Sequence, residues 1–142
     1  MEVSEIRRRL RAAIEKARRV SEERRARTDT AARDYQVFLE QRATPIFHQL
    51  AGALKAEGLS FKVFTPAASI RLASDRSPDD FIELSLDDTS DPPVVLGRTT
   101  RGRGRRMSTT DRALASGTPI ADVTEEDVLA FLLEELTALL ER

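Results

Sequence analysis

The sequence predicts an α+β fold: a long N-terminal helix, a second helix, an antiparallel meander of four or five strands, and a C-terminal helix packed on one face of the sheet. Three observations lead to this prediction. Residues 1–43 contain neither glycine nor proline and carry apolar residues at helical spacing. Residues 59–108 hold short alternating segments separated by turn residues, and residues 122–142 form an apolar run with a capped beginning. The chain has 142 residues, the length of one ordinary domain.

The first 43 residues are expected to form a long amphipathic helix that projects in part from the rest of the chain. Its apolar positions alternate between spacings of three and four residues, as in the narrow seam of a coiled coil. We assign these positions to self-association: Val3, Ile6, Leu10, Ala13, Ala17 and Val20. A helix of this length spans ~60 Å, more than a domain of this size covers, so part of it should project or meet a second chain. The alternative is a solvated N-terminus that folds only from about Thr30.

Residues 44–58 predict a second helix. Thr44 is suited to the N-cap, Pro45 to the first helical position and Gly58 to the position after the last turn. Proline within a helical run kinks or ends it, so the first helix is expected either to bend or to stop after Ala43. We therefore divide the chain into a projecting helix over residues 1–43 and an α+β core over residues 44–142.

The next fifty residues predict a meander of strands. The candidate strands are LSFKVFT, SIRLAS, DFIELSLD, VVLGRTTR and a short fifth strand, RRMST. The first two are expected to pair as a hairpin with Val63 opposite Leu72, which brings apolar side chains onto one face. The third segment alternates between apolar and polar residues, as a half-buried antiparallel strand does. Pairing it with the fourth places Glu83 opposite Arg98.

The C-terminal residues predict a helix that is buried on more than one side. Thr124 and Asp127 form a capping-box pattern ahead of the apolar run, and acidic residues occupy the first turn. Apolar residues cover more than half of the helix circumference, whereas a surface helix needs a stripe of about 100°. We expect contacts with both the sheet and another helix, and we assign Leu132 and Leu136 to self-association as well.

The composition argues against catalysis. Cysteine is absent, which excludes disulfides, thiolate metal sites and cysteine nucleophiles. His48 is the only histidine, and on a predicted helix we interpret it as a partly exposed residue rather than a base. Asp87, Asp88 and Asp91 flank the segment DTSDPP, where aspartate is a favoured turn former, and their spacing does not match an EF-hand loop. We expect neither an enzyme nor a bound cofactor or metal.

Five arginines fall within the eleven residues 97–107 and form the most conspicuous charge cluster. They are Arg98, Arg101, Arg103, Arg105 and Arg106. Arginine forks and flexible glycines suit phosphate, so anion or nucleic-acid contact is one interpretation. The other is a solvated hairpin whose charges are met by acids, either Glu83, Asp79 and Asp80 in the same chain or Glu134 and Glu135 on a second chain. Aromatic residues, which stack on bases, make up only 5% of the chain.

These features predict a non-enzymatic interaction or regulatory module that self-associates through its helices as a homo-oligomer, most simply a dimer. The alternative is a nucleic-acid-binding regulator that uses the hairpin 97–107 and the basic N-terminal helix. A second protein partner also fits, whereas nucleic acid is not favoured because the net charge is only −1. Without a signal peptide or an apolar span, a cytoplasmic location and no membrane contact are expected. The order of elements is similar to that of small bacterial nucleoid-associated proteins that dimerise, with no motif shared.

Overall fold

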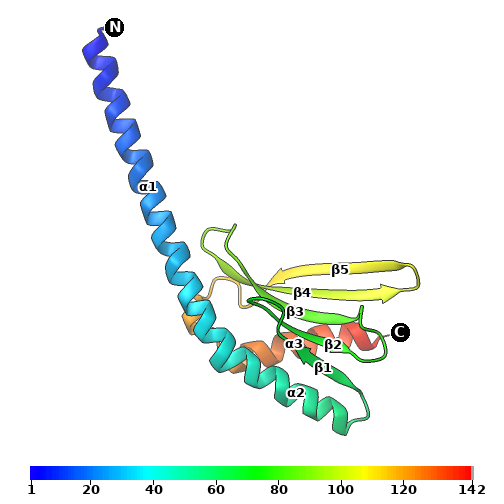
Figure 1. The fold of residues 1–142 in the computed structure, drawn as a ribbon. Helices are drawn as coiled ribbons and strands as arrows, with labels where there is room; N and C mark the ends of the chain where they lie inside the picture. The colour runs from blue at the N-terminus through cyan, green and yellow to red at the C-terminus, as the bar shows by residue number, and fades with distance from the viewer. Residues whose placement is uncertain (142) are drawn as a thin grey trace.

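Three helices and five strands make up the chain in the computed structural model, which describes residues 1–141 and confirms the predicted α+β fold (Figure 1). The helical elements are α1 (Val3–Phe38), a π-helical turn (Leu39–Ala43), α2 (Thr44–Ala56), a short 3-10 turn (Ile120–Asp122) and α3 (Glu125–Leu140). The strands are β1 (Phe61–Phe64), β2 (Ile70–Ser74), β3 (Phe81–Asp87), β4 (Val94–Arg103) and β5 (Arg106–Ala113).

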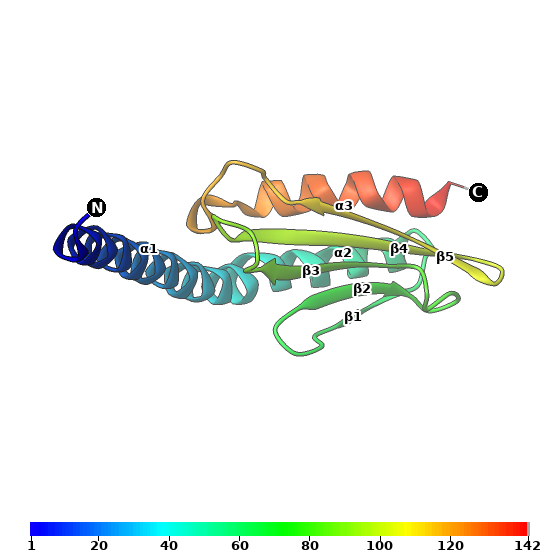
Figure 2. The ribbon, with the colours of Figure 1, turned by 90° about the horizontal axis from the view of Figure 1, so that it is seen from above.

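The five strands form one antiparallel sheet in the order β1-β2-β3-β4-β5. The register confirms two predicted pairs, Val63 with Leu72 and Glu83 with Arg98. The fifth strand is longer than expected, because β5 pairs with β4 along its whole length out to the facing residues Arg103 and Arg106. Strand β3 stops pairing at Phe81, so the β4–β5 hairpin extends beyond the sheet (Figure 2).

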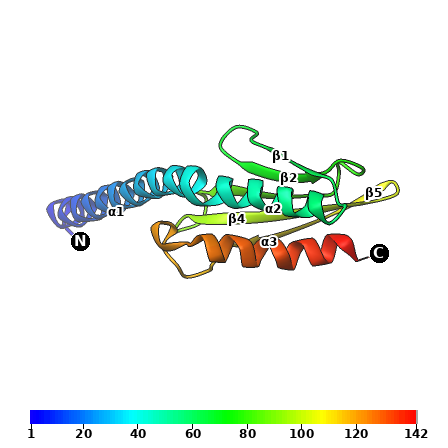
Figure 3. The same cartoon turned by 90° about the horizontal axis from the view of Figure 1, so that it is seen from below.

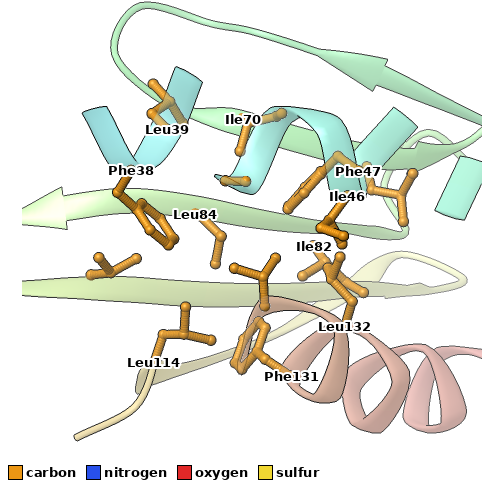
Figure 4. Packing of buried hydrophobic residues seen from close by; sticks show 14 of the residues in the cluster. Phe38, Leu39, Ile46, Phe47, Ile70, Ile82, Leu84, Leu114, Phe131 and Leu132 are labelled. Atoms are coloured by element: carbon orange, nitrogen blue, oxygen red, sulfur yellow. The ribbon is translucent and has the colours of Figure 1, made fainter. Parts of the chain in front are cut away.

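Helices α2 and α3 lie side by side across one face of the sheet (Figure 3). Inward-facing residues of β2, β3 and β4 meet the helices in a single apolar core, where Phe38, Phe47 and Leu132 are almost fully buried (Figure 4). Burial of apolar area of this kind is the main stabilising term of a fold. Contacts of α3 with β3 and with α2 confirm that this helix packs against both a sheet and a helix.

The junction between α1 and α2 is a bend rather than a break. A π-helical turn precedes Pro45, which has no N–H and whose ring would clash with the carbonyl four residues earlier in a regular helix. The extra residue of the π turn accommodates the ring, and the helical rod continues with a visible change of direction (Figure 1). The assignment of Thr44 as an N-cap was wrong: its hydroxyl donates back to the Leu39 carbonyl at 2.7 Å within the turn.

Local signals at the other helix ends are confirmed. Gly58 adopts φ 83° after α2, and the N–H groups of Gly58 and Leu59 donate to the carbonyls of Lys55 and Leu54, as in a Schellman motif. At the start of α3, the Thr124 hydroxyl accepts from the Asp127 N–H at 3.1 Å, and the Asp127 carboxylate accepts from the Thr124 N–H at 3.0 Å. These caps fix where each helix meets the sheet.

Candidate interaction surfaces

The first thirty residues of the chain lie outside the core. None of residues 1–30 is buried, and the core begins with Ala31, Tyr35 and Phe38. The predicted seam is therefore open to solvent. The exposed fraction of its four large apolar residues ranges from 49% at Ile6 to 71% at Val3. Ala13 and Ala17 are exposed too, and so is Ile14, an apolar residue beside the seam that the spacing argument did not include.

One ion pair ties the projecting helix to the body. The Arg27 guanidinium donates two hydrogen bonds to the Asp91 carboxylate, at 3.1 and 3.0 Å. The hydrogen bond from Arg27 lowers the pKa of Asp91 below its usual value. Beside this pair a shallow apolar pocket of about 360 Å³ lies between α1 and the loops that carry Pro92, Pro93 and Pro119. We call this region, where α1 first meets the loops of the body, the neck.

The Asp87 carboxylate organises the turn after β3, as the turn interpretation predicts. It accepts hydrogen bonds from the Thr89 N–H and hydroxyl, at 3.0 and 2.6 Å, and from the Ser90 hydroxyl at 3.0 Å. The Thr89 and Ser90 hydroxyls lower the pKa of this carboxyl group. Asp91, in contrast, holds α1, a role that the sequence interpretation missed.

The five arginines of the cluster divide into an anchored group and a free group. Arg98 is anchored, but its partner is not Glu83: it donates a fork to Asp111 on β5, at 2.9 and 3.2 Å. This contact lowers the pKa of Asp111. Glu83 pairs instead with Arg71 on β2 at 2.6 Å. The open face of the sheet therefore carries a row of alternating charges across four strands.

The root of the hairpin is held by α3 and by the loop before β3. Arg101 donates to the Glu141 carbonyl, and the Gly102 N–H donates to the Asp80 carboxylate at 2.7 Å. Arg112 on β5, which the sequence interpretation had not singled out, lies over the Phe131 ring at 4.5 Å. It also donates to both glutamates that were candidates for docking a second chain, Glu134 and Glu135, at 2.6 and 2.7 Å.

The tip of the hairpin is the free group. Arg103, Arg105 and Arg106 are exposed, and no ion pair among residues 1–141 involves them. Gly104 and Arg105 form the two-residue turn, with φ 61° at Gly104 alone, the pattern of a type II′ turn. Three guanidinium groups thus extend past the sheet on a two-stranded ribbon.

The other residues assigned from the sequence lie elsewhere. Leu132 and Leu136 retain 0% and 4% of their accessible area because they pack inside their own chain, so neither presents a surface to a second copy. His48 is exposed on α2. Within the described part of the chain, no three His, Asp or Glu side chains gather as a metal site, and no helix is long and apolar enough to cross a membrane.

No protein family, curated protein or solved structure matches this chain significantly. The exposure of their residues leaves two candidate interaction surfaces, the open seam of α1 and the arginine tip of the β4–β5 hairpin.

Proposed function

We propose that the protein is a non-enzymatic interaction module that self-associates through the seam of α1. The observation that supports this is a run of six exposed apolar positions on the part of α1 that extends away from the body, where none of them packs against another element among residues 1–141 (Figure 1). Helices in water are stabilised mainly by packing of an apolar face, and an isolated helix gains little from intrinsic propensity. A second copy supplies the same seam and gives both helices that packing.

Sedimentation velocity over a dilution series from ~1 mM to ~1 μM tests this function. We expect a species of twice the 15.9 kDa chain mass at the upper end of the series. The double change Ile6→Gln and Leu10→Gln removes two seam side chains but keeps good helix formers, so it should give a monomer. A matched control, Arg8→Gln with Ala12→Gln, has the same spacing on the opposite side of the helix and should leave the dimer intact. A wild-type chain that stays monomeric throughout the series contradicts the proposal.

The free arginine tip favours nucleic-acid binding as a second function. Three exposed guanidinium groups on a protruding ribbon fit phosphate groups, and three such contacts give a slope of about −3 in log affinity against log salt. Changing Arg103, Arg105 and Arg106 together to Ala should abolish binding to mixed-sequence DNA or RNA. Removing three basic residues elsewhere, Arg33, Lys55 and Lys62, should not. A wild-type dissociation constant no tighter than the nonspecific range of about 1 μM to 0.1 mM, measured near 150 mM salt, contradicts this second function.

A further inference from the structure

We infer that two copies of the chain pair through α1 in antiparallel orientation, with Val3 of one copy opposite Val20 of the other. This inference rests on the proposed self-association and adds its geometry. It is carried by three features of α1: the sizes of its seam residues, the side of the helix on which the body lies, and the length of helix that is free.

The seam residues have complementary sizes in the antiparallel arrangement. With Val3 opposite Val20, Ile6 faces Ala17 of the second copy and Leu10 faces Ala13, so every layer combines two medium residues or a large with a small one. The helix axes then stay at one separation along the contact. In a parallel pair, Leu10 faces Leu10 and Ala13 faces Ala13, which alternates wide layers with layers that leave voids. Uniform layers pack better than layers with cavities.

The three α1 residues buried in the body lie near the seam side of the helix, although the neck contacts of Ala26, Arg27 and Thr30 lie to one side of it, and this position of the body disfavours a parallel pair. A helix advances about 100° per residue, and on that basis the mean direction of the seam differs by roughly 25° from that of the three α1 residues buried in the body. These residues are Ala31, Tyr35 and Phe38. In a parallel pair the second helix runs along this side at the level of residues 31–38, where the body already sits. In an antiparallel pair the two bodies lie at opposite ends.

The length of free helix selects one antiparallel register. When Val3 faces Val20, Met1 of the second copy lies opposite Glu22 and its helix ends just before Ala26, the first residue of α1 at the neck. A shift of one heptad toward the body runs the second helix into the neck. It also brings Arg24 and Arg27 into the seam, and Arg27 is already held by Asp91. A shift the other way leaves Ala17 and Val20 uncovered.

Flanking charges oppose this arrangement weakly. The register places Arg9 beside Lys16 and Glu2 beside Glu23 of the second copy. A parallel pair instead places Glu2 beside Arg7 and Lys16 beside Ser21. Exposed pairs of this kind contribute little compared with the packing of the seam, so packing decides the orientation. The same contact supplies a diagnostic: Lys16→Glu should tighten the antiparallel dimer roughly three- to ten-fold by creating two Arg9–Glu pairs. The same charge reversal on the outer side, Arg19→Glu, should have a smaller effect.

Disulfide trapping tests the orientation, because the chain has no cysteine of its own. Single variants Val3→Cys and Val20→Cys are oxidised with glutathione disulfide, separately and as an equimolar mixture. We expect a disulfide-linked dimer only in the mixture, with peptide mapping showing the 3–20 link. Arg19→Cys, on the outer side of the helix, mixed with Val3→Cys serves as the control for random collision.

The outcomes separate the two proposals. A dimer in which Val3→Cys links rapidly to itself overturns the antiparallel geometry and leaves self-association through α1 standing. A dimer that forms no seam link in any combination overturns both the geometry and the seam as the interface. A chain that sediments as a monomer overturns the proposed function itself.

Discussion

Tyr35 shows at the scale of one residue how burial sets chemistry. Its ring is 2% exposed where α1 enters the body, and its hydroxyl donates to the Ala68 carbonyl at 2.6 Å. Burial, with a smaller contribution from the charge of Glu83, raises the pKa of Tyr35 to about 12. The hydroxyl therefore stays protonated in the folded chain at pH values where an unfolded tyrosine has already ionised.

Alkaline pH should destabilise the fold through this residue. Between the unfolded tyrosine pKa of about 10 and the folded value, only the unfolded state loses its proton, so the free energy of unfolding falls as pH rises through that window. Tyr35 is the only tyrosine and tryptophan is absent, so phenolate absorbance reports this one group. We expect its titration near pH 12 in the native protein. Tyr35→Phe should flatten the pH dependence of stability in the same window, and a native midpoint near 10 would refute this account.

At the scale of elements, the Phe131 ring of α3 lies against the backbone of β4 because Gly97 has no side chain. A methyl group at this position would overlap the Phe131 ring, which lies directly against the strand backbone. Arg112, the cross-strand neighbour of Gly97, packs on the same ring. The absence of a side chain at Gly97 therefore allows Phe131 of α3 to contact β4 and Arg112 of β5 at the same place.

The same substitution should have opposite effects at two glycines. Gly97→Ala forces the Phe131 ring aside and should lower the free energy of unfolding by ~1–3 kcal/mol. Gly52→Ala, within α2 and with no atom near the added methyl group, should raise it by ~0.5–1 kcal/mol because alanine favours the helix. Urea denaturation of the two variants measures both signs. If both variants changed the free energy of unfolding by the same amount in the same direction, the contact of Phe131 with β4 would not restrict position 97.

At the scale of the whole molecule, the body should fold without the projecting helix. Deleting residues 1–27 removes no buried side chain, and the tie that it breaks is the exposed Arg27–Asp91 pair. Solvent screens an exposed pair of this kind, so it contributes little to stability, and the unfolding midpoint should change little when both proteins are compared at a concentration that favours monomers. Circular dichroism should show the loss of helix with the cooperative transition retained. A deleted chain without that transition would show that α1 is part of the folding unit.

Sequence patterns predicted the elements because their signals are local. The capping box at Thr124, the glycine at 58 and the period-two alternation in β3 each lie within a few residues and have one structural solution. The prediction of Thr44 as an N-cap was wrong because its hydroxyl donates to the Leu39 carbonyl within the π turn. That turn depends on how α1 and α2 both reach the core, which is not a local signal.

Charge partners were harder to predict than strands. Arg98 stands between Glu83 on one side and Asp111 on the other, and register alone treats both as neighbours. The structure selects Asp111 for Arg98 and gives Glu83 to Arg71. The reach of each side chain over the sheet decides this, and no spacing in the sequence encodes it. These partners divide the arginine cluster into the anchored residues Arg98 and Arg101 and the exposed tip of Arg103, Arg105 and Arg106.

Because residues 1–30 lie outside the core, α1 would also act as a spacer in the proposed dimer. Inserting or deleting a heptad within residues 3–20 changes the helix by ~10.5 Å and alters no core contact. In the proposed antiparallel pair, each added heptad would move the two bodies, and with them the two arginine tips, farther apart by a fixed step. Insertions or deletions of whole heptads in the gene would then change the distance between the two arginine tips and leave the fold of each body unchanged.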